Sequence, residues 1–223
     1  MLIFLEANIG GGKSSFATKL IEKNLANITV LLEPLDEWVE TSDSNDVNIL
    51  QHYYSDPQKH SYLFQMNSFI SRCKRLEEAM QHDVQKSKDT HIIMERSVFS
   101  DYYCFAKNCY ELGTMTEIEF IVYKKWFEWL IEKFKIQPDG FIYMRTTPEE
   151  CHNRIKKRSR KSEDVIPLEY LKSLHMRHDD WLLDSELKEK KNVLVLDGNP
   201  NFLTNDKLYD DYVEQIKKFI ESL

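Results

Sequence analysis

One stretch near the N-terminus decides the fold, and it reads Leu2-Ile3-Phe4-Leu5-Glu6-Ala7-Asn8-Ile9-Gly10-Gly11-Gly12-Lys13-Ser14-Ser15-Phe16. The apolar start predicts a buried strand, the glycines predict a tight turn, and the residues from Lys13 onward predict the first turn of a helix. This order is typical of a phosphate-binding loop, in which backbone N–H groups and the positive end of a helix close on phosphate oxygens. The expected phosphate-binding residues are Asn8, Ile9, Gly10, Gly11, Gly12, Lys13, Ser14 and Ser15.

Two side chains of this loop have an expected chemical role. Lys13 would reach the β- and γ-phosphates of a nucleotide, and Ser14 would ligate Mg²⁺. The usual pattern, G-x-x-x-x-G-K-[ST], has glycine where this chain has Ala7, so the loop is strained if φ must be positive there. The alternative is a glycine-rich turn between a strand and a helix that binds nothing.

Length and composition limit the class of protein. A chain of 223 residues with 42% hydrophobic residues can bury one substantial core, so residues 1–223 are expected to form a single domain. No apolar run is long enough to span a bilayer, and the chain enters a strand at once, which leaves no room for a signal or transit peptide. We therefore expect a soluble, cytoplasmic protein with no membrane partner.

The net charge and the cysteines exclude further classes of protein. A formal net charge of −7 argues against general nucleic-acid binding, which requires a basic surface. The four cysteines, Cys73, Cys104, Cys109 and Cys151, form no C-x-x-C pair, so they are expected to be reduced and structural. His175 and His178 form an H-x-x-H pair, but no third ligand lies nearby in the sequence and we expect a solvated helix face.

The rest of the chain alternates short apolar strands with helices. Strands are expected over residues 28–33, 91–95, 141–145 and 193–197. Helices are expected from residue 57 to beyond 76 and over residues 99–111, 116–135, 148–157, 167–183 and 206–223, with loop and short helix over 36–56. Continuous apolar strands alternating with helices indicate an α/β fold with a five-stranded parallel sheet covered by helices on both faces.

All five expected strands end on a charged residue. These residues are Glu6, Glu33, Glu95, Arg145 and Asp197. Ligands of open α/β sheets bind beyond the carboxyl ends of the strands, so several of these charges should gather around one crevice with the phosphate-binding loop. Any one of them alone could be a solvated strand terminus.

Phosphoryl transfer needs a base or orienting group, a metal ion and cations, and the sequence offers candidates for each. Glu33, followed by the rigid Pro34, is the candidate general base. Glu95 is a second carboxylate, able to assist the metal through water, with Arg96 beside it. Residues 154–161 carry six cations in eight residues and could form a lid, over about 154–166, whose Arg154, Arg158 and Arg160 close on phosphates. A solvated helix face or a nuclear-targeting run are the alternatives.

These motifs together resemble the deoxyribonucleoside kinases, in the deoxycytidine/deoxyguanosine kinase branch, from Leu2 to nearly the last helix. The matching motifs are Glu6 to Ser14, Glu33-Pro34 with Trp38, Phe64-Gln65 with Ser71-Arg72, Glu95-Arg96-Ser97 with Ser100-Asp101, and Ile166-Pro167-Leu168-Glu169-Tyr170-Leu171. The resemblance implies a P-loop kinase fold, ATP with Mg²⁺, a homodimer built on helices, and transfer of the ATP γ-phosphate to the 5′-hydroxyl of a deoxyribonucleoside in nucleotide salvage.

The resemblance also implies roles for individual residues. Glu33 would deprotonate the 5′-hydroxyl with Arg96 near it, and Gln65 would pair with the nucleobase edge. Trp38, Phe64 and Phe105 would wall the sugar and base, Tyr54 and Glu163 would hold the 3′-hydroxyl, and Asn201-Phe202 would lie on the adenine side of ATP. Without the resemblance, a structural role explains each of these aromatic side chains better, with Trp38, Phe64 and Phe105 as ordinary core residues and Tyr54 as a surface tyrosine.

The base preference and two rival functions stay open at this point. Arg72 and Asp101 are expected to form an ion pair beside Gln65, and thymidine should be a poor substrate because thymine lacks an amine and carries a 5-methyl group. The run from Ser68 to Arg72 resembles the deoxyguanosine kinase members, which implies a preference for deoxyguanosine and deoxyadenosine, with deoxycytidine possible. A thymidylate-type nucleoside monophosphate kinase would share the loop and sheet but would need cations for the acceptor phosphate. A non-catalytic kinase-like interaction subunit is the other alternative, and only Ala7 supports it.

Overall fold

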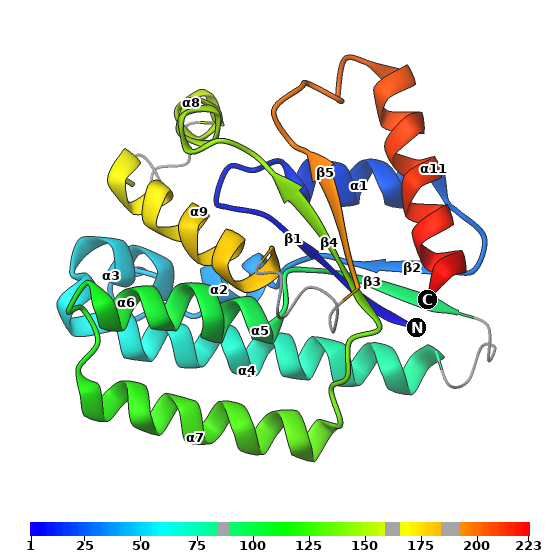
Figure 1. Cartoon of the computed structure of the whole chain (residues 1–223). Helices are drawn as coiled ribbons and strands as arrows, with labels where there is room; N and C mark the ends of the chain where they lie inside the picture. Colours follow the sequence, from blue (N-terminus) through cyan, green and yellow to red (C-terminus); the bar gives the residue numbers. More distant parts are fainter. Residues whose placement is uncertain (84–89, 159–165, 184–191) are drawn as a thin grey trace.

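The computed structural model describes residues 1–83, 90–158, 166–183 and 192–223, and its centre is a five-stranded parallel sheet (Figure 1). The strand order is β2-β3-β1-β4-β5. The strands are β1 (Leu2–Glu6), β2 (Ile28–Leu31), β3 (His91–Glu95), β4 (Gly140–Arg145) and β5 (Val193–Asp197). Because β1 is central, the chain leaves it toward one edge of the sheet and later returns to its other side, which places a topological switch point beside the loop that follows β1.

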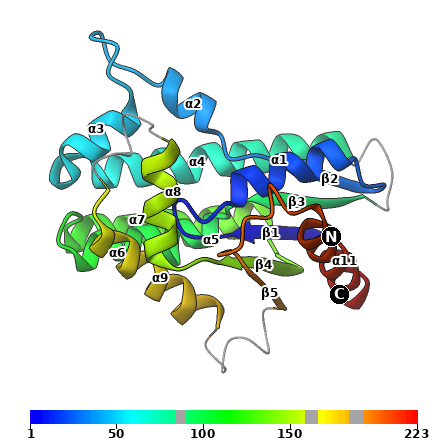
Figure 2. The same cartoon turned by 90° about the horizontal axis from the view of Figure 1, so that it is seen from above.

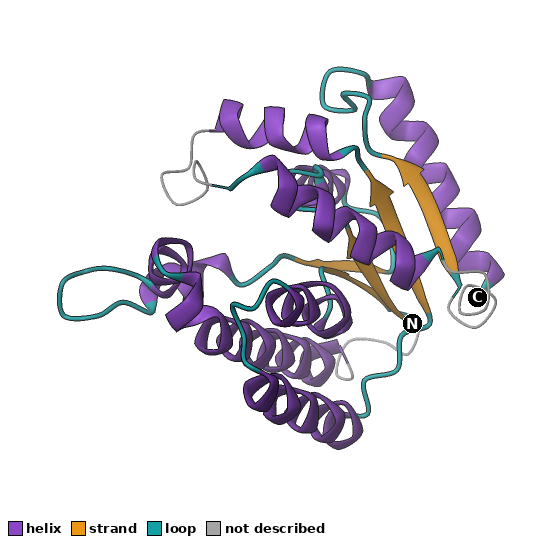
Figure 3. Cartoon of the chain, turned by 60° about the vertical axis from the view of Figure 1, so that its left-hand side comes forward, coloured by secondary structure: helices purple, strands orange, loops and turns teal. Residues whose placement is uncertain are grey.

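Helices cover both faces of this sheet, as the sequence predicts (Figure 3). The helices before β4 are α1 (Lys13–Lys23), α2 (Leu35–Glu40), α3 (Ile49–Ser55), α4 (Pro57–Asp83), α5 (Val98–Ser100), the π-helix η1 (Asp101–Ala106), α6 (Lys107–Glu111) and α7 (Glu117–Phe134). Those after β4 are α8 (Pro148–Arg158), α9 (Leu168–Leu182) and α11 (Asp206–Ser222).

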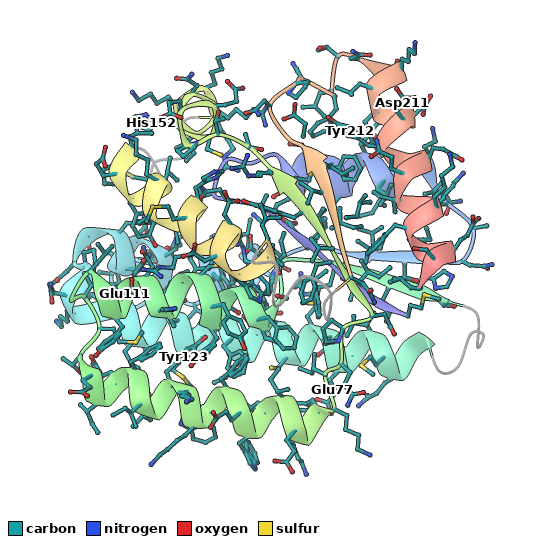
Figure 4. The ribbon with its side chains drawn as sticks, in the orientation of Figure 1. Glu77, Glu111, Tyr123, His152, Asp211 and Tyr212 are labelled. Carbon is teal, nitrogen blue, oxygen red and sulfur yellow. The ribbon has the colours of Figure 1, made fainter. Side chains whose placement is uncertain are left out.

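Alternate side chains of β1 point to opposite faces of the sheet, and each face packs into a separate hydrophobic cluster. Ile3 and Leu5 belong to a cluster completed by α1 and α11, whereas Phe4 belongs to a larger cluster with α4, η1 and α7. Tyr123 of α7 lies in that larger cluster and is fully buried (Figure 4). Successive strand residues point to opposite faces of a sheet, so a continuous apolar run is required where both faces are covered.

Several helices gather at the carboxyl ends of the strands. Seen from above, α3, α8 and α9 lie at the end toward which the strands run, away from the N-terminus (Figure 2). No helix within the described residues is long and apolar enough to cross a membrane. The structure therefore concentrates loops and helix ends at one edge of the sheet, where an open α/β sheet binds its ligands.

Two departures from the predicted elements lie near the cavity. The second strand ends at Leu31, so Glu33 lies in the turn after the strand and not at its last position. The helix expected over residues 99–111 is three consecutive pieces, α5, η1 and α6, with the wider π-turn beginning at Asp101. A π-turn is often found at a functional site, and here it carries Asp101 and Phe105.

Candidate active site

One cavity of about 560 Å³ joins the phosphate-binding loop to an aromatic compartment beyond it. Its wall contains, from the loop, Ile9, Gly10, Gly11, Gly12, Lys13, Ser14 and Ser15; from the compartment, Glu33, Leu35, Trp38, Leu50, Tyr54, Phe64, Gln65, Ser68, Arg72, Arg96, Asp101 and Phe105; and from the far side, Glu150, Arg154, Lys157, Arg158, Pro200, Asn201, Phe202 and Leu203. The two halves meet at Glu33 and Lys13, which lie 3.9 Å apart between carboxylate and ammonium.

Two glycines give the loop its shape. Gly10 has φ +75° and Gly12 has φ +97°, a region that side-chain-bearing residues rarely adopt. A Cβ atom at Gly10 would lie 2.5 Å from the carbonyl oxygen of Cys151, so the loop also passes too close to α8 for any side chain there. The loop then leads into α1 at Lys13, and the helix N-terminus faces the cavity.

Neighbouring elements brace the loop from outside. Asn8 Nδ2 donates to the carbonyl of Leu171 at 2.8 Å, and Thr146 Oγ1 donates to the carbonyl of Gly11 at 3.0 Å. Arg154 reaches over the loop from α8, with its Nη2 donating to the Asn199 carbonyl at 2.8 Å. Asn8 was expected to bind phosphate, but its side chain is used for bracing and does not line the cavity.

Ala7 is accommodated without strain. It does not take a positive φ, and it is fully buried. A Cβ atom added at Gly11 would lie 2.8 Å from the methyl carbon of Ala7. The Ala7 methyl group therefore occupies space that is free only because residue 11 is a glycine. The departure from the usual pattern at Ala7 therefore does not break the loop.

A lysine, a hydroxyl and a carboxylate meet at the start of α1. Ser14 Oγ donates to Glu95 Oε1 at 2.5 Å, and Lys13 Nζ lies 3.6 Å from the same carboxylate. Hydroxyl and carboxylate oxygens are the donors that Mg²⁺ prefers, and this ion usually completes its shell with phosphates and waters. Within the described residues no group of three or more His, Cys, Asp or Glu could hold a metal, so this pair fits Mg²⁺ only together with a bound phosphate.

Glu33 is surrounded by cations. Arg72 Nη2 donates to Glu33 Oε1, Arg96 Nε lies 3.3 Å from that oxygen, and Lys13 lies on the other oxygen. Burial alone would raise the pKa of this carboxyl, but the three cations outweigh it and lower the pKa to about 2. Glu33 is therefore fully ionised at neutral pH and fixed in position before any ligand binds.

Arg96 occupies a strained backbone position at the end of β3. Its φ is +62°, which is uncommon for a residue with a side chain, and such strain often marks a functional site. The guanidinium stacks on Phe105 at 4.5 Å from the ring centroid, and its Nη2 donates to the Ala7 carbonyl at 3.1 Å. These contacts aim the cation at Glu33 across the cavity.

The aromatic compartment is built by α2, α3 and α4. Trp38 packs edge-on against Phe64 at 5.4 Å, and its Nε1 donates to Ser71 Oγ at 2.9 Å. Tyr53 stacks on Phe64 at 4.7 Å, and the neighbouring Tyr54 lines the cavity. The walls are therefore rigid and flat, as a planar heteroaromatic ligand requires.

Arg72 bridges two carboxylates at the closed end of the compartment. Besides Glu33 it binds Asp101 through Nη1, and it lies over the Trp38 ring at 5.0 Å. Burial, only partly offset by Arg72, raises the pKa of Asp101 to about 6. The sequence predicted the Arg72–Asp101 pair but missed the bond to Glu33, because nothing local links residues that are 39 positions apart.

Polar atoms around the cavity are left without partners, which is what a site for a polar ligand requires. Within the described residues, the buried side-chain atoms with no hydrogen-bond partner include Ser68 Oγ, Arg72 Nε, Arg96 Nη1 and Asp101 Oδ2. Each belongs to a residue that lines the cavity. A nucleoside with hydroxyls and a polar base edge supplies groups of the kind that these atoms can bond.

Most of the predicted residues lie together, and the exceptions are specific. The strand-end residues Arg145 and Asp197 do not line the cavity. Arg145 forms an ion pair with Asp179 at 2.7 Å, and Asp197 Oδ1 accepts a hydrogen bond from the Asn199 backbone N–H at 3.0 Å. Glu6 is fully buried below the loop, and neither carboxylate oxygen has a hydrogen-bond partner within the described residues. Arg160 and Glu163 lie outside the described residues.

Sequence reasoning missed several residues of the wall. Leu35, Leu50, Glu150, Lys157, Pro200 and Leu203 line the cavity without having been predicted. Lys157 belongs to the basic run, so charge density could have indicated it. Leu35 directly follows Glu33-Pro34, whereas nothing in the local pattern distinguishes Leu50 or Leu203 from ordinary apolar residues.

Comparison with known proteins agrees with this geometry. A family model described as deoxynucleoside kinase matches residues 3–221. The chain belongs to the deoxynucleoside kinase family. It is 36% identical to deoxycytidine kinase 2 of Gallus gallus (99% of this chain, 90% of the relative) and 34% identical to deoxycytidine kinase of Homo sapiens (99% and 91%). It is 35% identical to the mitochondrial deoxyguanosine kinase of Xenopus laevis (98% and 89%).

Family membership settles part of the predicted function. This deoxynucleoside kinase is an ATP-dependent phosphotransferase that acts on deoxyribonucleosides, as the sequence motifs predicted. Its relatives act on different bases, so membership does not select one. One of them is named as mitochondrial, so the cytoplasmic compartment stays a prediction.

Proposed function

We propose that this kinase transfers the γ-phosphate of ATP to the 5′-hydroxyl of purine deoxyribonucleosides, deoxyguanosine and deoxyadenosine, with deoxycytidine as a further substrate. The product would be the 5′-monophosphate, which serves nucleotide salvage. The observation that carries the proposal is the position of Glu33. Its carboxylate lies at the junction of the phosphate-binding loop and the aromatic compartment, 3.9 Å from Lys13 and 3.3 Å from Arg96.

The phosphate end has a surplus of cations. In the proposal Gly10 to Ser15 cradle the β- and γ-phosphates through backbone N–H groups, and Lys13 neutralises their charge. Arg154 and Arg158 line the same end. Arg160, which lies outside the described residues, would bind phosphate together with them. Asn201 and Phe202 would contact the adenine of ATP. The Phe202 ring lies close to the loop, 3.3 Å from where a Cβ atom at Gly12 would be.

A magnesium ion would be held by Ser14 Oγ, with Glu95 binding it directly or through water. When bound, it would neutralise charge on the bridging phosphate oxygens. Glu33 would then accept a hydrogen bond from the 5′-hydroxyl and take its proton as the phosphoryl group transfers. Arg96 would lie beside the attacking oxygen, where negative charge develops.

The nucleoside would lie in the aromatic compartment. Trp38, Phe64 and Phe105 would pack on the sugar and base, and the Gln65 amide would pair with the base edge. Tyr54 and Glu163 would hold the 3′-hydroxyl. Asp101 Oδ2, buried and without a partner within the described residues, would accept from an exocyclic amine, whereas Arg72 and Ser68 would contact the remaining edge.

A substrate panel tests this proposal. ATP turnover coupled to product formation would be measured with deoxyguanosine, deoxyadenosine, deoxycytidine, thymidine and thymidine monophosphate. We expect high kcat/KM for the purines, lower kcat/KM for deoxycytidine, and little turnover with thymidine or its monophosphate. A Lys13→Ala variant provides the zero-activity control. Efficient use of thymidine monophosphate would favour a monophosphate kinase, and failure with every nucleoside would overturn the proposal.

We further propose a homodimer formed by α4 and α7. These helices pack on each other, and they expose large apolar side chains at helical spacing: Leu63 and Ile70 on α4, and Ile118, Ile121, Trp126 and Trp129 on α7. Large apolar side chains exposed along two packed helices are of the kind that mark a protein–protein interface. Sedimentation should give a dimer for the wild type and a monomer for Ile70→Lys with Ile118→Lys. Ile21→Lys, an exposed site on α1, is the matched control and should leave the dimer intact.

A further inference from the structure

The segment that follows β5 supplies the far wall of the phosphate end. Residues 198–203, here called the donor loop, run between β5 and α11 (Figure 1). Pro200, Asn201, Phe202 and Leu203 of this loop line the cavity. The described backbone of the loop is neither helix nor strand, so contacts with neighbouring elements must fix its distance from the phosphate-binding loop. Several of those contacts are made by Asn199, which does not itself line the cavity.

Every polar group of Asn199 has a hydrogen-bond partner. Its backbone N–H and its Nδ2 donate to Asp197 Oδ1 at 3.0 and 2.8 Å. Its Oδ1 accepts from the backbone N–H and the hydroxyl of Thr147 at 2.9 and 3.0 Å, and its carbonyl accepts from Arg154 Nη2 at 2.8 Å. These partners fix the orientation of the side-chain amide, because a backbone N–H cannot accept and a carboxylate cannot donate.

Two adjacent threonines in the turn between β4 and α8 hold the two loops side by side. Thr146 Oγ1 donates to the Gly11 carbonyl at 3.0 Å, and Thr147 binds the Asn199 amide. Arg154 joins the same two loops again, because its Nη1 lies 3.5 Å from the Gly11 carbonyl oxygen while its Nη2 donates to Asn199. The separation of the phosphate-binding loop from the donor loop is therefore set through Asn199.

Close packing makes that separation matter. A Cβ atom at Gly198 would overlap Thr146 Oγ1, so the backbone just before Asn199 passes directly against that hydroxyl. The Phe202 ring packs edge-on against Phe16 of α1 at 5.5 Å between ring centroids, close to the phosphate-binding loop. A shift of the donor loop would therefore move Phe202 relative to the backbone that is proposed to cradle phosphate.

We propose that Asn199 is a positioning residue for the phosphate donor, which holds the donor loop at the distance from the phosphate-binding loop that one ATP molecule spans. An ATP whose phosphates are bound can place its adenine against Asn201 and Phe202 without further cost only if that distance is already set. The inference rests on the proposed function, which puts adenine at those two residues, and it adds a residue that acts through them. Asn199 should matter for the adenosine part of ATP and not for the triphosphate part or for the nucleoside.

The test compares ATP with inorganic tripolyphosphate, which lacks the adenosine. Kd values in the presence of Mg²⁺ would be measured by calorimetry, with tripolyphosphate measured by displacement of ATP. Asn199→Ala breaks exposed hydrogen bonds of modest strength, so the Kd for ATP should rise about three- to tenfold while that for tripolyphosphate stays within about twofold. The KM for the nucleoside should not change.

Asn205→Ala is the matched control. Asn205 lies shortly after the donor loop and caps α11 by accepting from the Leu208 N–H at 3.1 Å, but it does not line the cavity. Loss of the cap should lower the melting temperature, yet both Kd values should stay at the wild-type level. The control therefore separates a loss of stability near the donor loop from a loss of position within it.

Asn199→Asp changes the charge with little change in shape. The carboxylate can still accept from Thr147, but its second oxygen would face Asp197 Oδ1, to which Nδ2 donates in the wild type. The Kd for ATP should therefore rise at least as far as in Asn199→Ala. Adding Asp197→Asn returns a donor to this contact and should bring the Kd back to within about twofold of the wild type.

Three results would overturn the inference. Equal losses of affinity for ATP and tripolyphosphate would mean that Asn199 supports the phosphate-binding loop in general. An unchanged Kd for ATP in both variants, or no recovery on adding Asp197→Asn, would also contradict it. Should Asn199→Ala fail to fold, Asn199→Asp with and without Asp197→Asn still decides. A wild type that binds ATP but phosphorylates no nucleoside would defeat the proposed function, whereas the two Kd values would still decide the role of Asn199.

Discussion

The two ends of the cavity are built in different ways. The phosphate end is made mainly of backbone from one continuous loop, shaped by Gly10 and Gly12 at positive φ. The nucleoside end is made of side chains from four helices (α2, α3, α4 and η1) and from the turns after β2 and β3, held by the Glu33–Arg72–Asp101 chain of charges. A backbone site is fixed by local sequence, whereas a side-chain site exists only after the whole fold has formed.

Their charge balance differs as well. At the phosphate end Lys13, Arg154, Lys157 and Arg158 outnumber the acidic residues of the wall, which suits a polyanion. At the nucleoside end Arg72 and Arg96 are matched by Glu33 and Asp101, so a neutral ligand enters without leaving a buried charge unpaired. Under the proposed function, this difference would let one cavity take ATP at one end and an uncharged nucleoside at the other.

The largest expected effect concerns the residue where the two ends meet. Glu33→Gln keeps the shape and an acceptor for Arg72 but removes the proton acceptor, so kcat should fall by about 10²- to 10⁴-fold. Nucleoside binding, measured as Kd by intrinsic fluorescence, should change little. Glu37→Gln, one turn further along and outside the cavity wall, is the matched control. A Glu33→Gln variant with near-wild-type kcat would show that the carboxylate does not act as the base.

The same comparison explains how far the sequence could predict this molecule. The sheet, the helices on both faces and the phosphate end were predicted because each depends on contiguous patterns of apolar residues and glycines. At the nucleoside end, Trp38, Phe64 and Gln65 were placed by family resemblance. Their apolar or amide character alone would have been equally consistent with core residues.

The failures have one physical cause, which is packing between distant segments. His178 was expected on a solvated face, but it is fully buried against Tyr143 with its ring stacked at 5.9 Å. Arg145 ends its strand as predicted yet turns to Asp179 of α9. The Arg72–Asp101 pair was predicted, but the bond of Arg72 to Glu33 was missed, because it depends on how α4 lies against the turn after β2.

The next prediction tests the nucleoside end alone. Arg72→Met with Asp101→Ala should raise the kcat/KM ratio of thymidine to deoxyadenosine by about tenfold or more, because it opens space for the 5-methyl group and removes the amine acceptor. Absolute kcat should fall, since Arg72 also holds Glu33. Asp101→Ala alone keeps that bond and separates the two effects. A wild type already as efficient with thymidine as with its best purine would contradict the assigned pocket.

Glu6 lies beneath the boundary between the two ends and should make stability depend on pH. Burial raises its pKa to about 7, although the charge of the nearby Arg96 favours the ionised form. The folded protein therefore holds this proton more tightly than the unfolded chain, whose value is 4.5. The contribution of Glu6 to stability is full below about pH 4.5 and is lost as the pH rises through about 7.

A neutral glutamine should remove this dependence. At about pH 8, Glu6→Gln should raise the free energy of unfolding by on the order of 2–3 kcal/mol, whereas at about pH 4.5 the two proteins should be nearly equal. Urea denaturation at both pH values measures the difference, with the exposed Glu22→Gln on α1 as control. If the free energy of unfolding changed with pH by the same amount in the wild type and in Glu6→Gln, ionisation of Glu6 would not destabilise the folded protein.

The smallest effect is expected at the phosphate end, from Ala7→Gly. The usual loop has glycine there, yet Ala7 does not take a positive φ, so a glycine gains no needed conformation. The change removes a buried methyl group and adds freedom to the unfolded chain, which together should cost about 1 kcal/mol of stability. The KM for ATP should stay within about twofold, because phosphate is bound by the N–H groups of later residues.

The reciprocal change at Gly11 shows whether Ala7 and Gly11 share one space. Gly11→Ala should impair ATP binding strongly, since its Cβ atom would lie 2.8 Å from the Ala7 methyl and 2.9 Å from the Asn8 carbonyl oxygen. Combining it with Ala7→Gly removes the first clash and leaves the second, so recovery of the ATP KM should be partial. A marked loss of ATP affinity in Ala7→Gly alone would contradict this account. It would mean that phosphate binding at this end of the cavity requires the Ala7 methyl group in addition to the backbone N–H groups.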